Sequence, residues 1–174
     1  MMNLYLYIGL TILILGGSKL IYNKYKNNSK DTFKKWYYLV NKLNHHFNMD
    51  ESIALAIIHV ESNGNPKAVG DNGNSIGLMQ VTQPALSDVN EFFGKNFSLS
   101  ELVHNPENQI YAGMAYFNIV YRRAEQNIDL AIRGYNAGLR RAKENDSISQ
   151  SYLIKVKKYA EIFKQYIGGV NVNV

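Results

Sequence analysis

The stretch IALAIIHVE, which runs from Ile53 to Glu61, is apolar on nearly every side when it is wound as a helix. A helix of this kind is expected inside a protein rather than on its surface. Asp50 stands where a helix N-cap belongs, and Asn63 and Gly64 supply a signal for the helix to end. The pattern therefore predicts a buried helix.

Glu61 places a carboxyl group at the end of this helix, where hydration is lost. Loss of hydration favours the neutral acid and raises its pKa. A glutamic acid tuned toward neutral pH is the usual donor for protonating a glycosidic oxygen. The alternative is a structural role, in which Glu61 caps a neighbouring group or pairs with a lysine. Its position alone favours this alternative.

The segments on either side also show helical periodicity. Apolar residues recur at spacings of three and four, and Asn105 with Pro106 forms a cap and first-turn pair. The further helices predicted in this way cover residues 32–47, 84–94, 106–124, 129–136 and 150–167. Residues 65–82 lack this periodicity, and a short hairpin fits there. The predicted fold class is mainly α.

The composition is that of one globular domain with a basic surface. The 174 residues carry 19 Lys and Arg against 14 Asp and Glu, and the net charge of +5 favours an anionic partner. The chain has no cysteine, which excludes disulfides, thiolate nucleophiles and the zinc site of deaminases. The four histidines lack a zinc-protease spacing, so no metal site is predicted.

Residues 3–22, NLYLYIGLTILILGGSKLIY, carry no charge before Lys19 and form a predicted transmembrane anchor. Their length matches the roughly 20 residues that a spanning helix needs. A cleaved signal peptide is the alternative, but the basic start typical of such peptides is missing. Residues 23–31 are predicted as a polar linker, residues 32–167 as one helical domain and residues 168–174 as a tail.

Four short motifs follow one another along the chain. They are ES at Glu61 with NPKA after it, GLMQ from Gly77 to Gln80, YNAG from Tyr135 to Gly138, and SYLIKV around Tyr152. In this order, and with NPENQIYAGMAYF before the third, the motifs resemble those of the lytic transglycosylases, which cleave peptidoglycan. The resemblance covers residues 36–163 and implies a lysozyme-like helical fold of the goose type.

The resemblance implies a role for each matching residue. Glu61 would be the single catalytic acid and base, and Ser62 would position it or pack the end of its helix. The residues that the resemblance assigns to the substrate-binding groove are Ser62, Met79, Gln80, Tyr135, Asn136 and Tyr152. The alternative for Tyr152 is a place in the core, which is common for an aromatic residue at helical spacing.

The reaction implied by the resemblance needs one acid and no cofactor. Glu61 would protonate the glycosidic oxygen between N-acetylmuramic acid and N-acetylglucosamine, and would then take the proton of the muramoyl 6-hydroxyl. The product would be a 1,6-anhydro ring. One position departs from the family: Gly70 replaces the usual serine nine residues after the glutamate, and Asp71 follows it.

Two other functions fit the same residues. Asp71 would activate water if the protein were a lysozyme-like hydrolase. A weakly active or non-catalytic component would use the groove to bind peptidoglycan or to assist assembly. Nucleic acid would also suit the basic charge, but no matching motif is present, so no nucleic-acid partner is predicted.

Every lysine near the predicted anchor lies at or after its C-terminal end. The positive-inside rule would then leave the bulk of the chain in the cytoplasm, away from the cell wall. A phage particle with its own membrane, which opens the wall during entry, would resolve this conflict, and a secretion apparatus is the alternative. The predicted location is a single-pass protein of a viral membrane or of the bacterial inner membrane facing the periplasm, with virion or secretion-apparatus partners.

Overall fold

The computed structural model describes residues 30–144 and 146–169. The chain divides into two compact units after Lys35, and the helical domain is the unit that begins at Trp36. The predicted anchor at 3–22 lies outside the described residues, as does most of the predicted linker at 23–31. Within the part that is described, no helix has both the length and the apolar character needed to cross a bilayer.

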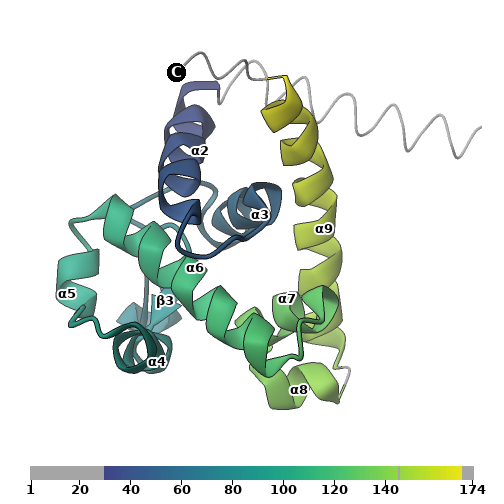
Figure 1. Cartoon of the computed structure of the whole chain (residues 1–174). Helices are drawn as coiled ribbons and strands as arrows, with labels where there is room; N and C mark the ends of the chain where they lie inside the picture. Colours follow the sequence, from purple (N-terminus) through teal and green to yellow (C-terminus); the bar gives the residue numbers. More distant parts are fainter. Residues whose placement is uncertain (1–29, 145, 170–174) are drawn as a thin grey trace, which may run out of the picture. The chain divides into compact units, whose positions relative to one another are not determined.

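The described chain consists of helices and one small sheet (Figure 1). In order, the elements are α2 (Lys30–Asn44), α3 (Glu51–Ser62), β1 (Val69–Gly70), the 3-10 helix η1 (Asp71–Gly73), β2 (Ser75–Ile76), β3 (Val81–Thr82), α4 (Gln83–Phe93), α5 (Leu99–Leu102), α6 (Pro106–Arg123), α7 (Ile128–Ala137), α8 (Leu139–Lys143) and α9 (Ser147–Gly168). The prediction of a mainly α fold is confirmed.

Helix α3 is the buried helix that the sequence predicts. Leu55 and Ile58 have no exposed surface. The side chain of Asp50 accepts a hydrogen bond from the backbone N–H of Ser52 at 2.9 Å, and Asn63 ends the helix in the left-handed conformation with φ 51°. Helix α3 packs against α9, which lies beside it in Figure 1.

The short irregular segment folds into a small antiparallel sheet in the order β1-β2-β3. Val69 pairs with Ile76, and Ser75 pairs with Thr82. Helix η1 forms the connection between β1 and β2, so the predicted hairpin is confirmed and a third strand extends it. The turn between β2 and β3 carries the GLMQ motif.

Gln109 of α6 fastens this turn to the core. Its side chain is fully buried, and its Oε1 accepts a hydrogen bond of 2.9 Å from the backbone N–H of Leu78. Its Nε2 donates to the carbonyls of Pro66 at 3.0 Å and Leu102 at 2.7 Å. A Cβ at Gly77 would overlap the Gln109 amide. Because buried polar groups are costly when unpaired, these bonds fix the turn in place.

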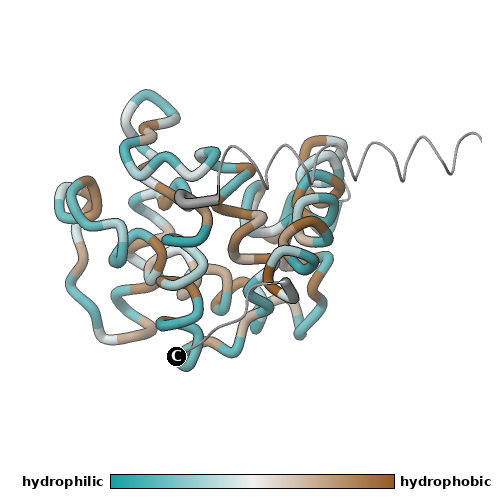
Figure 2. The backbone as a smooth tube through the Cα atoms, turned by 90° about the horizontal axis from the view of Figure 1, so that it is seen from above, coloured by the Kyte–Doolittle hydropathy of each residue, from teal (hydrophilic) through white to brown (hydrophobic). Residues whose placement is uncertain are grey.

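Hydrophobic and hydrophilic residues alternate along the helices of Figure 2, as expected for helices with one buried face. In α6, the predicted apolar face is confirmed by the burial of Ile110, Met114 and Phe117. The same helix also brings Gln109 into the core.

Several helix boundaries differ from the prediction. The sequence analysis missed α5 and α8, which have only 4 and 5 residues and are too short to show periodicity. Helix α9 begins at Ser147 rather than at residue 150, because Asp146 caps it. Helix α2 begins inside the predicted linker, and Gly168 of the predicted tail belongs to α9.

Replacing Gln109 by alanine is expected to lower the free energy of unfolding by about 3 kcal/mol, because three buried backbone groups lose their partner. Urea titration measures this change. Gln165→Ala makes the same chemical change at an exposed position of α9 and is expected to cost less than about 0.5 kcal/mol. Equal losses in the two variants would contradict the role of Gln109.

Candidate active site

Glu61 lies in the last turn of α3 and is partly exposed. Its Oε1 accepts a hydrogen bond of 2.6 Å from the hydroxyl of Tyr152 in α9. Burial raises the pKa of Glu61 from 4.5 to about 7; the Tyr152 hydrogen bond lowers it and the negative charge of Asp71 raises it, both to a smaller extent. The direction of the shift is the one expected from the sequence, and it leaves a share of the acid form of Glu61 present near neutral pH.

Tyr135 and Tyr152 approach from α7 and α9, and both side chains are buried. Burial and the charge of Glu61 raise the pKa of each phenol well above 10. Both therefore remain neutral hydroxyl donors. Tyr152 donates to Glu61, whereas Tyr135 donates to the backbone carbonyl of Met79 at 2.8 Å.

Ser62 connects the end of α3 to the GLMQ turn. Its hydroxyl oxygen lies 3.0 Å from the carbonyl of Ile58 and 2.8 Å from that of Leu78, and the two carbonyls share its single proton as acceptors. This geometry supports the positioning role expected for Ser62. It also places the turn directly beside the carboxyl-bearing end of the helix.

Met79 has no exposed surface. Its side chain fills the space left by Gly113 in α6, where a Cβ would overlap it. The side chain therefore lies in the core rather than along a groove wall as expected from the sequence. Its backbone carbonyl, held by Tyr135, is what connects it to the site.

Gln80 holds the sheet together instead of presenting a free amide. Its Nε2 donates to the carbonyls of Ala68 at 3.2 Å and Gly77 at 2.9 Å, and its Oε1 accepts from the hydroxyl of Ser75 at 2.8 Å. Both amide protons are thus used within the protein. These bonds also offset the left-handed backbone of Gln80, whose φ is 46°.

Gly70 has an ordinary extended backbone, with φ −116° and ψ 178°, and a side chain there would require the side chains of Gln80 and Ser75 to shift. A Cβ there would overlap Oε1 of Gln80 and lie 2.6 Å from the hydroxyl oxygen of Ser75. The hydroxyl of Ser75 therefore occupies space that a serine side chain at residue 70 would need. Ser75 is buried and engaged with Gln80.

Asn136 is exposed and follows Tyr135 in α7. It borders a cavity of about 290 Å³ whose other lining residues are Ser147, Ile148, Ser151, Tyr152 and Lys155. The structure thus connects Glu61 to Tyr152 directly and, through the neighbouring Ser62, to the GLMQ turn, whereas Asn136 shares a cavity with Tyr152 and not with Glu61.

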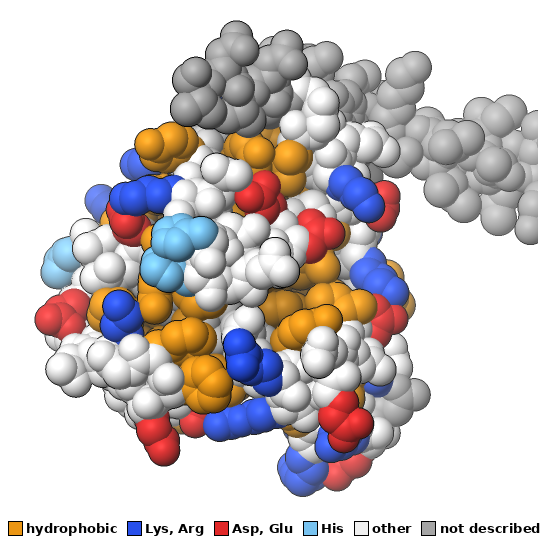
Figure 3. All heavy atoms as spheres, viewed as in Figure 1, with side chains coloured by type: hydrophobic (Ala, Val, Ile, Leu, Met, Phe, Trp, Pro, Cys, Tyr) orange, Lys and Arg blue, Asp and Glu red, His pale blue; other side chains and the backbone are white. Residues whose placement is uncertain are grey.

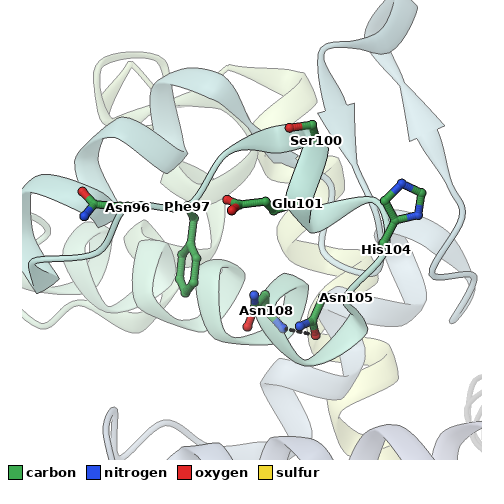
Figure 4. A pocket seen from close by; sticks show the side chains of 7 residues that line it. All are labelled: Asn96, Phe97, Ser100, Glu101, His104, Asn105 and Asn108. Carbon is green, nitrogen blue, oxygen red and sulfur yellow. Dashed lines mark hydrogen bonds between the residues drawn. The ribbon is translucent and has the colours of Figure 1, made fainter.

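A second cavity, of about 750 Å³, lies elsewhere and is shown in Figure 4. It is lined by Asn96, Phe97, Ser100, Glu101, His104, Asn105 and Asn108. Its acidic residue, Glu101, accepts hydrogen bonds from the backbone N–H and the hydroxyl of Ser98, which lower the pKa of Glu101. A carboxyl held in its ionised form is a poor proton donor, so this cavity is not the candidate catalytic site.

Basic side chains lie among acidic ones on the face shown in Figure 3. Several are paired across the surface, as in Lys42 with Glu107 at 2.9 Å and Arg123 with Asp88 at 2.7 Å. On this face the positive charge does not form the continuous stripe typical of nucleic-acid binding.

The sequence analysis missed Gln109 and Ser75. The sequence does contain a signal for Gln109: it is an uncharged polar residue next to Ile110, on the side of α6 that is buried, where a polar side chain needs hydrogen-bond partners. No periodicity marks Ser75, which lies in a strand of two residues. Its role becomes visible only when Gly70 and Gln80 are brought together.

A family model described as the transglycosylase SLT domain matches residues 38–157. Membrane-bound lytic murein transglycosylase C from Photorhabdus laumondii is 33% identical over 144 residues, which is 78% of this chain and 38% of that protein. The protein of the same name from Yersinia pestis is 38% identical over 113 residues, which is 60% of this chain and 31% of that protein. The chain thus spans well under half the length of these relatives.

Solved structures share the fold. The 70-kDa soluble lytic transglycosylase in complex with bulgecin A has a TM-score of 0.68 and 24% identity, over 75% of this chain and 24% of that chain. An inactive Glu-to-Gln mutant of lytic transglycosylase Slt from Pseudomonas aeruginosa has a TM-score of 0.67 and 24% identity, over the same shares of the two chains. The lysozyme-like helical fold expected from the motifs is confirmed.

Restoring a serine at residue 70 is expected to destabilise the domain by about 1–3 kcal/mol, because the new side chain crowds Ser75 and Gln80. The double variant Gly70→Ser/Ser75→Ala is expected to recover part of this loss, since it empties the contested space. Urea unfolding of both single variants and the double variant measures the coupling. Strictly additive losses would show that residues 70 and 75 do not compete for one space.

Proposed function

Because the chain belongs to the transglycosylase SLT domain family, we propose that it is a peptidoglycan lytic transglycosylase. The bond it cleaves is the β-1,4 linkage between N-acetylmuramic acid and N-acetylglucosamine. The observation that carries the proposal is the partly exposed carboxyl of Glu61, whose pKa is about 7 and whose oxygen is held by Tyr152. The names of the relatives from Photorhabdus and Yersinia, lytic murein transglycosylases, support the same activity.

In the first step, the protonated carboxyl of Glu61 donates its proton to the glycosidic oxygen as the bond from the muramoyl C1 breaks. A pKa of about 7 keeps a large share of the acid form at neutral pH while leaving it acidic enough to give up the proton. Because the Tyr152 hydroxyl donates to one oxygen of Glu61, it restrains the position of that oxygen.

In the second step, the carboxylate of Glu61 takes the proton of the muramoyl 6-hydroxyl as O6 bonds to C1. The acid form is thereby restored, no water is consumed, and the product is a 1,6-anhydro ring. The Tyr152 hydrogen bond stabilises the carboxylate between the two steps. Ser62 and Tyr135 act indirectly, because they hold the GLMQ turn against the end of α3.

A lysozyme-like hydrolase is the second candidate. The observation in its favour is that Asp71 is close enough for its negative charge to raise the pKa of Glu61. Asp71 is also exposed in η1, where water reaches it. Activation of water by Asp71 would give a product with a reducing end instead of an anhydro ring.

Replacing Glu61 by glutamine is expected to lower the rate of cleavage of purified peptidoglycan by about 100-fold to 10,000-fold, since no proton donor remains. Mass spectrometry of the wild-type products is expected to detect anhydro-muropeptides. The control, Glu161→Gln, removes an exposed carboxylate from α9 and is expected to retain full activity.

Equal activity of Glu61→Gln and wild type would refute the catalytic assignment. Release of products with reducing ends alone would favour the hydrolase that uses Asp71. Tight binding of glycan strands by a wild type that releases no product would favour the non-catalytic peptidoglycan-binding component.

We further propose that the domain works while attached to a membrane through residues 3–22. The word membrane-bound in the names of the relatives supports membrane attachment. The two finer settings, a phage particle during entry and a secretion apparatus, rest on the lysines that follow the predicted anchor.

Protease added to spheroplasts that make only this protein tests the orientation. If the chain lies N-out and C-in, as the phage setting requires, the domain is expected to remain intact until the membrane is opened with detergent. Digestion of the domain from outside would contradict the phage setting. It would favour an enzyme that faces the wall from the bacterial inner membrane.

A further inference from the structure

The cavity of about 750 Å³ in Figure 4 shares no lining residue with the candidate active site. Its volume lies well inside the range of roughly 300–1,000 Å³ that is typical of small-molecule sites. Figure 4 shows Phe97, Glu101 and Asn108 near one another, with Asn96 and His104 on opposite sides of them. This spread-out arrangement suits a chain of linked units better than a compact ligand.

Three polar side chains of the lining, those of Asn96, His104 and Asn108, have no hydrogen-bond partner among the residues that the structure describes. The hydrogen bond of 3.1 Å from Asn108 to Asn105 comes from the backbone N–H of Asn108 and leaves its side-chain amide unengaged. An amide offers two donor protons and an acceptor oxygen, and a neutral imidazole offers one donor and one acceptor. The cavity therefore presents both kinds of group, as the hydroxyl and acetamido groups of a sugar require.

The aromatic part of the lining is held in place before any ligand binds. The backbone N–H of Phe97 donates to Oδ1 of Asn90 at 2.9 Å, and Nδ2 of Asn90 donates to the carbonyl of Phe97 at 2.8 Å. The ring of Phe97 meets that of Tyr111 edge-on, with centroids 5.7 Å apart, and Phe97 is only partly buried. A ring fixed in this way packs against the apolar face of a sugar with little further loss of freedom.

The charges of the lining favour an uncharged ligand. The described lining has no Lys or Arg, and hydrogen bonds from the backbone N–H and the hydroxyl of Ser98 keep Glu101 ionised by lowering its pKa. Both bonds are to Oε2, so Oε1 remains to accept from a sugar hydroxyl. An anionic ligand would meet this negative charge without a cation in the lining to offset it. In peptidoglycan, the muramoyl residues carry carboxylates through their peptides, whereas N-acetylglucosamine has no ionised group.

We propose that this cavity is a second sugar site, which binds an N-acetylglucosamine residue of a glycan strand outside the catalytic site. The side chains of Asn96, His104 and Asn108 bond to its hydroxyl and acetamido groups. Phe97 packs against its ring, and Glu101 accepts from a hydroxyl. The inference rests on the proposed function, because it takes peptidoglycan as the polymer. A polymer held at two sites binds more tightly than at either site alone.

NMR titration of the full chain with chitotriose, the β-1,4-linked trimer of N-acetylglucosamine, tests the site directly. The side-chain amide signals of Asn96 and Asn108 are expected to shift, and they report on this cavity even if the trimer also enters the catalytic site. In Asn108→Ala, the dissociation constant read from the Asn96 signal is expected to rise about threefold to tenfold, as for loss of one hydrogen bond. The control, Gln165→Ala, removes an exposed amide from α9 and is expected to leave this constant unchanged.

Absence of shifts at Asn96 and Asn108, or equal affinity of Asn108→Ala and wild type, would overturn the proposal while leaving the proposed function intact. Muramoyl dipeptide, which carries carboxylates, is expected to leave both amide signals in place. An equal response to this charged ligand would overturn the assignment of the cavity to an uncharged sugar.

Turnover of long glycan strands gives a second readout. Asn108→Ala is expected to raise KM about threefold and to leave kcat unchanged, because the candidate acid is not touched. An unchanged KM, or a loss confined to kcat, would contradict a second point of attachment. A wild type that binds chitotriose in this cavity but releases no product from peptidoglycan would instead refute the proposed function and leave the sugar site standing.

Discussion

The burial of the Glu61 carboxyl group at the end of α3 is the constraint on which the rest of the site depends. A carboxyl in this position keeps its proton near neutral pH only because α3 lies inside the domain and removes water from it. The same burial requires a partner for the charged form, and Tyr152 provides one from a helix distant in sequence. The contact between α3 and α9 is therefore both a core contact and the basis of the proposed chemistry.

Around this pair, the polar side chains of the family motifs mostly bind to the protein itself. A backbone carbonyl of the turn between β2 and β3 accepts a hydrogen bond from each of Ser62, Gln80 and Tyr135. Gln109 of α6 forms hydrogen bonds with three further backbone groups. Such a network positions the end of α3 before substrate arrives, so little reorganisation is needed during the reaction.

The sequence was sufficient to predict features that depend on local pattern. The buried helix, its Asp50 cap, the α6 face and the raised pKa of Glu61 all follow from spacing and burial. It was insufficient where a role depends on contacts across the chain. The core position of Met79 follows from the absence of a side chain at Gly113, and the role of Ser75 follows from its proximity to Gly70 and Gln80. Short helices such as α5 give no periodic signal at all.

The most direct test of the central claim is a pH titration of the Glu61 carboxyl carbon by 13C NMR, assigned by difference from Glu61→Gln. The midpoint is expected near pH 7, and kcat/KM should fall as pH rises above it, because the protonated form is the donor. A midpoint near the ordinary value of 4.5 would contradict the account, because Glu61 would then be ionised at neutral pH and unable to start the reaction.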